Sequence, residues 1–432
     1  MKNQKLILLT IGLLSATLAT AQFTPNFQPL ADSFEVENPS AVQAINIVYD
    51  DIDPKKQLFH ILLPDMEGNH PLVIFIHGGG FTGGDPGIIF KDPERRATAK
   101  YFLDNGFAFA SFGYRLIAEN EPDNEGVIKS LMDAKRALQF VRYYADDLFV
   151  DPDQIALTGG SAGGGTSIWL ASHSDMADPE ANDPILQEST RVKAVFASGS
   201  QSTYDLFKWE TEVYENFDGQ GTNFTLDSIA EIMTTERIMN FYGGMDSIDQ
   251  MIHDPALVQY REEVDMLAHL SDDDPPLYIF SQSGAIHPSD DVLHHWLHSN
   301  EVYEAAVAAQ LSEVKVEIKS LSLNTTEGES GNEFLLRQLG GPFSVPQKVL
   351  GIQPTLSAEI FPNPAQDYFQ VSLHHEELSQ IEVSTLSGTI VHQQSGSEIS
   401  DRIDTSLLHP AIYLVRLTST SGTRTIKRLI VD

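Results

Sequence analysis

Short apolar runs alternate with helical repeats along the chain up to about residue 340. Apolar runs bounded by turn residues are typical of strands buried in a parallel sheet, and apolar positions three or four apart indicate helices. Strands are expected over 44–49, 57–63, 72–76, 107–112, 155–157, 192–197, 277–280 and 314–321, and helices over 97–103, 127–144, 166–171, 292–311 and 332–339. This alternation predicts an α/β domain over residues 22–340, with a mostly parallel sheet and helices on both faces.

An aromatic-rich segment interrupts the alternation at about residues 200–274. It carries several helical signals between two predicted strands, so we interpret it as a cap inserted into the α/β domain. Its aromatic residues are expected to form the core of the cap rather than to contact a ligand. They are Tyr204, Phe207, Trp209, Tyr214, Phe217 and Phe224.

The last part of the chain has a different pattern. A proline-containing linker is expected over residues 341–356, and short alternating strands follow from 357 to 432. The strands are predicted over 369–373, 381–385, 389–392, 412–417 and 425–431. Such spacing, with turn residues between the strands, predicts a small all-β sandwich.

The first 21 residues have the pattern of a secretory signal peptide. A lysine-containing start precedes the apolar run Leu6–Leu18, and Ala19-Thr20-Ala21 supplies a cleavage site. The run is too short to span a bilayer, and no other segment is long and apolar enough to do so. We therefore expect a secreted protein without a transmembrane segment.

The net charge argues against some classes of partner, and the cysteine content excludes some kinds of chemistry. The chain has 27 Lys and Arg residues against 61 Asp and Glu residues, a formal net charge of -34. This charge repels nucleic acid and anionic membranes and favours solubility, so no nucleic-acid partner is expected. The absence of cysteine excludes disulfides, thiolate metal sites and cysteine nucleophiles.

Two glycine-rich motifs carry the candidate chemistry. The sequence Gly159-Gly160-Ser161-Ala162-Gly163 lies between a predicted strand and a predicted helix. A sharp turn in that position projects the serine hydroxyl above the sheet edge, which makes Ser161 a candidate nucleophile. His77-Gly78-Gly79-Gly80 ends an earlier strand, and its backbone N–H groups can point at an oxyanion.

These motifs, with Tyr114-Arg115-Leu116 and the run from Asp151 to Gly165, resemble the hormone-sensitive-lipase-like and carboxylesterase branch of the α/β-hydrolases. The resemblance is close over about residues 71–171. It implies an oxyanion hole formed by Gly79, Gly80 and Ala162. It also implies an acid after strand 277–280 and a histidine after strand 314–321.

The expected histidine is missing, because no histidine occurs between His298 and His374 and Ser330 stands about where the base should be. The segment 287–298 instead contains four histidines. Asp291 and His295 are four residues apart, so on one helical face they would form an acid–base pair. His287 is the alternative base, and Asp290 the alternative acid. A lost base and a metal site also stay open, but no third metal ligand can be placed, so we expect neither metal nor cofactor.

The tail resembles the C-terminal sorting domain of type IX secretion cargo. The resemblance rests on Phe361-Pro362-Asn363-Pro364-Ala365, Ser387-Gly388, the run 412–415 and the closing run 427–431, with Ala411 where that family usually has glycine. It implies the type IX secretion machinery as a partner and an extracellular or cell-surface location. The alternative is a carbohydrate-binding sandwich, but the tail lacks an obvious aromatic platform.

Two functions are compatible with these residues. The first is a secreted serine carboxylic-ester hydrolase acting through an acyl-Ser161 intermediate on short acyl esters, with a small molecule or a polysaccharide as the alcohol part. The second is a non-catalytic binding protein on a hydrolase fold that has lost its base. The intact glycine motifs favour the first, and the missing histidine favours the second.

Overall fold

The structure is a computed structural model that describes residues 23–119, 121–215, 224–285, 287–341, 358–373, 377–385, 390–396, 399–406, 408–421 and 424–431. The predicted signal peptide, the linker beyond residue 341 and Phe217 lie outside these ranges.

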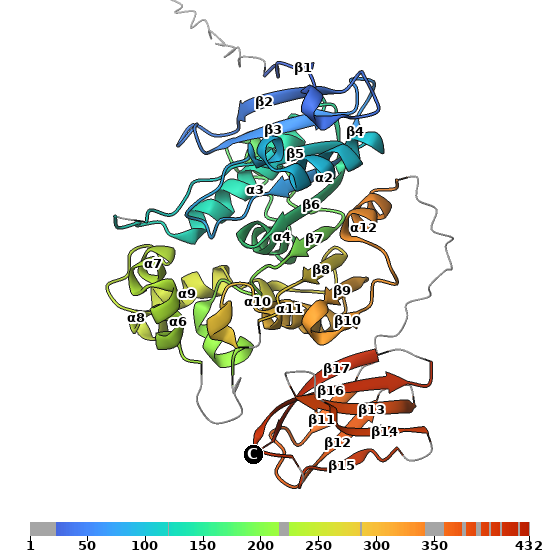
Figure 1. Cartoon of the computed structure of the whole chain (residues 1–432). Coiled ribbons are helices and arrows are strands. Elements are labelled where there is room, and N and C mark those ends of the chain that lie inside the picture. Colours follow the sequence, from blue (N-terminus) through green and yellow to red (C-terminus); the bar gives the residue numbers. More distant parts are fainter. Residues whose placement is uncertain are drawn as a thin grey trace, which may run out of the picture.

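A ten-stranded sheet forms the centre of the larger part of the chain, in the order β1-β2-β3-β5-β4-β6-β7-β8-β9-β10 (Figure 1). The strands from β5 to β9 in this order are parallel, whereas β1, β2, β3 and β10 join the two edges as antiparallel strands. Their bounds are β1 Gln28–Pro29, β2 Val42–Val48, β3 Leu58–Leu63, β4 His70–Ile76, β5 Ala108–Phe112, β6 Val150–Gly160, β7 Val195–Ser198, β8 Leu277–Ser281, β9 Val314–Ile318 and β10 Leu323–Asn324.

Helices cover both faces of this sheet. Strand β4 shows why, because Ile74 and Ile76 belong to one buried cluster while Val73 and Phe75 belong to the other. The first cluster packs under α3 (Val127–Tyr143), α4 (Ala162–Ser172) and α11 (Trp296–Ala308), and the second under α2 (Pro93–Asp104) and α12 (Gly331–Gln338). The short helix α1 (Ile88–Lys91) precedes α2. The predicted mostly parallel sheet between two helical layers is confirmed.

The predicted insertion lies between β7 and β8 and is helical. It contains α5 (Leu206–Lys208), the π-helical turn η3 (Trp209–Val213), α6 (Leu226–Met233), α7 (Thr235–Phe241), α8 (Gln250–His253), α9 (Pro255–Glu263) and α10 (Met266–His269). Tyr204, Trp209 and Tyr214 are buried and belong to the same core cluster as the central strands. These aromatic residues therefore contribute to the core, as their pattern predicts.

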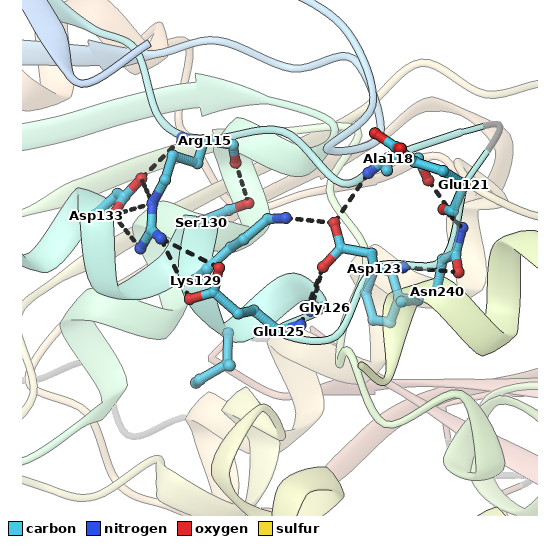
Figure 2. A network of polar contacts seen from close by, with 12 residues as sticks. Arg115, Ala118, Glu121, Asp123, Glu125, Gly126, Lys129, Ser130, Asp133 and Asn240 are labelled. Atoms are coloured by element: carbon cyan, nitrogen blue, oxygen red, sulfur yellow. Dashed lines mark hydrogen bonds and ion pairs between the residues drawn. The ribbon is translucent and has the colours of Figure 1, made fainter. Parts of the chain in front are cut away.

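A polar network ties the insertion to the loop that follows β5 (Figure 2). The Asn240 side chain on α7 donates to the carbonyl oxygens of Ala118 and Glu121 at 2.9 and 3.0 Å, and its oxygen accepts from the Asp123 amide at 3.2 Å. Lys129 pairs with the Asp123 carboxylate from the adjacent helix α3. These contacts hold α7 against the loop at a fixed place.

The C-terminal part consists of two antiparallel sheets, β11-β12-β15 and β14-β13-β16-β17. The strands are β11 Ala358–Phe361, β12 Tyr368–Leu373, β13 Leu378–Thr385, β14 Ile390–Ser395, β15 Arg402–Asp404, β16 Ala411–Ser419 and β17 Arg424–Val431. Phe369, Ile381, Val415 and Leu417 are among the residues of a buried cluster separate from those of the larger sheet. The predicted all-β region is confirmed, with the two additional short strands β11 and β15.

The start of α11 differs from the sequence-based expectation in a way that matters for the site. A helix over 292–311 is predicted, but α11 begins only at Trp296. The segment before it is a short 3₁₀ turn, η4 (Pro288–Asp290), followed by a non-helical turn over 291–294. The backbone of Asp291 is extended, with φ -162°.

Candidate active site

Ser161 occupies a strained turn between β6 and α4. Its backbone has φ 54° and ψ -128°, a conformation that costs a non-glycine residue about 1–3 kcal/mol. The turn is tight enough that a Cβ at Gly163 would overlap the carbonyl of Ile76, so this neighbour must be glycine. The Ser161 amide donates to the carbonyl of Ser198 at 3.0 Å, which fixes the turn to the adjacent strand β7.

The Ser161 hydroxyl lies against the side chain of His294. Its Oγ is 2.9 Å from His294 Nε2, and His294 Nδ1 is 3.0 Å from Asp291 Oδ1. Since an ionised carboxylate only accepts hydrogen bonds, Nδ1–H donates to Asp291, which leaves Nε2 to accept from the serine hydroxyl. The side chains of His294 and Asp291 are 39% and 35% exposed, so solvent and substrate can reach them.

The structure does not bring His295, the residue that the sequence suggests as the base, to Ser161. His295 is fully buried at the N-cap of α11, where its ring accepts from the Leu297 amide at 3.3 Å. Because α11 begins after residue 295, Asp291 and His295 do not share a helical face. The turn instead brings the residue three positions after Asp291, His294, to the carboxylate.

Three other residues at or near expected base or acid positions have local structural roles. They are His287, Asp290 and Ser330. His287 caps η4, with its Nδ1 2.6 Å from the Ser289 hydroxyl, and Asp290 accepts from the His287 amide. Ser330 caps α12, where Glu333 completes a reciprocal capping box. These contacts place none of the three side chains against Ser161.

The glycine loop after β4 passes directly beside this turn. A Cβ at Gly78 would lie 2.7 Å from the carbonyl oxygen of Gly160. Gly79 and Gly80 have φ of 113° and 58°, and the carbonyl of Gly79 accepts from the amides of Thr82 and Gly83 at 3.1 Å. Ala162 is the first residue of α4, where helix amides have no intrahelical partner.

His77 supports the start of this loop. Its ring stacks on Tyr114 with centroids 4.3 Å apart, and the Tyr114 hydroxyl donates to the His77 carbonyl at 2.8 Å. Burial lowers the pKa of His77, so the ring is neutral at pH 7 and its Nδ1–H donates to the Gly78 carbonyl at 2.8 Å. The loop is therefore held by packing and hydrogen bonds rather than by charge.

Ser161, Asp291 and His294 open into a cavity of about 670 Å³. Its walls come from the loop after β4, the N-terminal parts of α1 and α2, the end of β7 and the loop after β8. Within the described ranges, no helix is long and apolar enough to cross a membrane. In the same part of the chain, no three His, Asp or Glu side chains are grouped as a metal site would require.

Strand order, insertion and the serine turn after β6 together define an α/β-hydrolase. The chain belongs to the BD-FAE family of α/β-hydrolase esterases, whose model matches residues 59–281. A second model, the secretion system C-terminal sorting domain, matches residues 359–432. The resemblances to the esterase branch and to the type IX sorting domain are thereby confirmed, and the sorting domain indicates export to an extracellular or cell-surface location.

Curated relatives are similar over part of their length. The probable carboxylic ester hydrolase LipM of Mycobacterium tuberculosis is 31% identical over 131 residues, which are 30% of this chain and 27% of LipM. Carboxylesterase NlhH of the same species is 36% identical over 108 residues, 25% of this chain and 31% of NlhH. The chain thus spans less than a third of the length of each.

Among solved structures, a truncated carbohydrate esterase from gut microbiota is 17% identical with a TM-score of 0.46, covering 65% of this chain and 88% of that chain. A bifunctional GH43-CE protein of Bacteroides eggerthii is 18% identical with a TM-score of 0.48, covering 68% and 38% respectively. Both likenesses are too distant to bear on the substrate.

Proposed function

We propose that the protein is a secreted serine carboxylic-ester hydrolase in which Ser161 is the nucleophile, His294 the base and Asp291 the acid. The observation that carries the proposal is the continuous chain from Ser161 Oγ through His294 to Asp291, with contacts of 2.9 and 3.0 Å. A nucleophile in contact with a base that a third group orients is the arrangement that acyl transfer needs.

The reaction follows from the roles of these atoms. His294 Nε2 takes the proton of Ser161 as Oγ attacks the ester carbonyl, while Asp291 stays ionised and stabilises the imidazolium. The amides of Gly79, Gly80 and Ala162 are the proposed donors to the oxyanion, and α4 adds its positive N-terminal end. The protonated His294 then gives its proton to the departing alcohol oxygen, and water activated by the same ring releases the acid.

The proposed substrates are short acyl esters, because the cavity measures only about 670 Å³ and Phe75 and Ile88 are the large apolar side chains among its described lining residues. Because the protein is secreted, the proposed alcohol part is an extracellular polysaccharide. The BD-FAE family and the curated esterase relatives support ester hydrolysis as the reaction class.

The assay that tests this function uses p-nitrophenyl acetate with the wild type, Ser161→Ala, His294→Ala and His287→Ala. Removal of the serine or of its base is expected to lower kcat by at least about a thousandfold. His287→Ala removes a neighbouring, exposed histidine and serves as the matched control, which is expected to keep its activity.

A binding protein without a base would give the opposite result. If the wild type releases no more nitrophenol than Ser161→Ala, the proposed hydrolase function fails. If His294→Ala keeps the wild-type rate while Ser161→Ala does not, the base is another group.

A further inference from the structure

Arg95 lines the cavity beside the serine turn. It lies in the first turn of α2, and its Nη2 is 3.9 Å from the position that a Cβ of Gly160 would take, one residue before the nucleophile. The guanidinium lies over the Phe75 ring, with Cζ 5.0 Å from the ring centroid. Stacking on a ring holds a guanidinium in place and leaves the N–H groups at its edge able to bind.

The carboxylates that line the cavity already have partners. Asp85 pairs with Lys91 at 2.9 Å, and Asp92 accepts from the Arg95 amide as the N-cap of α2. Asp291 is bound to His294. Arg95 is the one lysine or arginine among the described lining residues, and no carboxylate of the described chain lies within 4.0 Å of its guanidinium.

We propose that Arg95 binds an anionic group of the substrate, a carboxylate or a sulfate, so that the preferred ester is carried by an acidic compound such as a sugar acid. This inference rests on the proposed function and names its substrate class. A planar guanidinium offers two parallel N–H groups that match a carboxylate or sulfate edge. Beside the nucleophile, such a contact would set which ester of the compound reaches Ser161.

The negative charge of the whole protein increases the expected effect of Arg95 on the binding of an anionic substrate. At a formal net charge of -34, the molecule as a whole repels an anionic substrate. A single fixed cation within the cavity then decides whether such a substrate is held or excluded. The proposed preference is therefore local, and it should disappear with this one side chain.

The test compares matched acetyl esters that differ only in the group at C6, which is neutral in one and anionic in the other two. These are acetylated methyl glucoside, the corresponding methyl glucuronoside and the methyl glucoside 6-sulfate, assayed with the wild type, Arg95→Gln, Arg95→Lys and Arg96→Gln. The wild type is expected to prefer one of the anionic esters in kcat/KM. In Arg95→Gln the ratio of anionic to neutral kcat/KM should fall about tenfold to a hundredfold, mainly through KM.

The controls separate recognition from folding. Arg96→Gln removes the same charge one position away from the cavity lining, and it should keep the wild-type ratio. Arg95→Lys keeps the charge but loses the two-point contact, so an intermediate ratio is expected and is informative if Arg95→Gln does not fold. The glucuronoside and sulfate arms show which anion fits.

Failure of the proposed function and failure of the proposed role of Arg95 give different results. If p-nitrophenyl acetate is hydrolysed by the wild type and not by Ser161→Ala, the function stands. An unchanged charge ratio in Arg95→Gln and Arg95→Lys would then overturn the role of Arg95 alone. A wild type that prefers the neutral ester would overturn it as well. Absence of all Ser161-dependent hydrolysis would instead overturn the proposed function.

Discussion

At the scale of single residues, the proposed site depends on which of two adjacent histidines faces Ser161. His294 and His295 are adjacent in sequence, yet one contacts Ser161 and the other is buried under α11. The difference arises because Asp291 has an extended backbone and the helix begins at Trp296. The sequence contains four histidines in this segment, and their spacing alone does not show where the helix starts.

Substitution of Asp291 by asparagine tests the orientation of the base. The amide would offer an N–H or a weaker acceptor to His294 Nδ1, so the ring would no longer be fixed with Nε2 as the acceptor. We expect kcat for p-nitrophenyl acetate to fall about 10³- to 10⁴-fold with little change in KM. Asp290→Asn is the matched control, and an equal loss in both variants would contradict the assignment of Asp291.

At the scale of elements, the turn before α11 is supported by the insertion. His298 lies on α11, is fully buried, and its Nε2–H donates to the Val292 carbonyl at 3.1 Å, inside the turn that carries Asp291 and His294. Its Nδ1 accepts from the Ser202 hydroxyl at 3.0 Å, and the Tyr214 hydroxyl donates to the same Val292 carbonyl at 2.7 Å. Residues at the start of the insertion thus support the turn that carries the proposed acid and base.

Lowering the pH should reduce the stability of the folded protein through His298. Burial lowers the pKa of His298 to about 3, so below pH 6.5 the unfolded chain takes up a proton that the folded chain refuses. Stability is therefore lost as the pH falls from about 6.5 towards 3, at about 1.4 kcal/mol per pH unit for this group.

The measurement is urea unfolding of the wild type and His298→Gln at pH 7.5 and pH 5. Glutamine costs stability at pH 7.5, where His298 is neutral in both states. At pH 5 the difference in unfolding free energy between the two proteins should shrink by about 2 kcal/mol. A difference that stays constant or grows would show that His298 is not held neutral.

At the scale of the whole molecule, two separately packed parts are joined by one chain. The sorting domain has its own buried cluster, and its Arg416 side chain donates to the Leu321 carbonyl of the larger part at 3.1 Å. No residue of the sorting domain is among the described residues that line the cavity. The proposed catalytic site and the sorting domain therefore belong to different cores.

A chain ending at Gly341 tests this division of roles. Because the sheet, both helical layers and the cavity lie before that residue, the shortened protein should keep the kcat/KM of the full chain on p-nitrophenyl acetate. It should also fail to reach the outside of the cell when produced in a host with type IX secretion. Loss of activity together with loss of folding would show that the two cores are not independent.

Local patterns explain what could be predicted from the sequence. The strands, the turn at Ser161 and the glycine loop could be recognised from residues within a few positions, and so could most strands of the tail. The contact between Ser161 and His294 joins residues 133 positions apart, and it depends on a helix boundary that the hydrophobic pattern places four residues too early. The short strands β11 and β15 were missed because pairing with β12, not their own composition, makes them strands.

In the proposed triad of Ser161, His294 and Asp291, the loop between β10 and α12 contributes no catalytic residue. In a triad with its histidine there, that loop would have to keep its length and shape, whereas here Ser330 merely starts a helix. Substitutions of Ser330 that keep the start of α12 should therefore leave ester hydrolysis unchanged, whereas Glu329 in the same loop is held by Arg337 and by the Tyr278 hydroxyl.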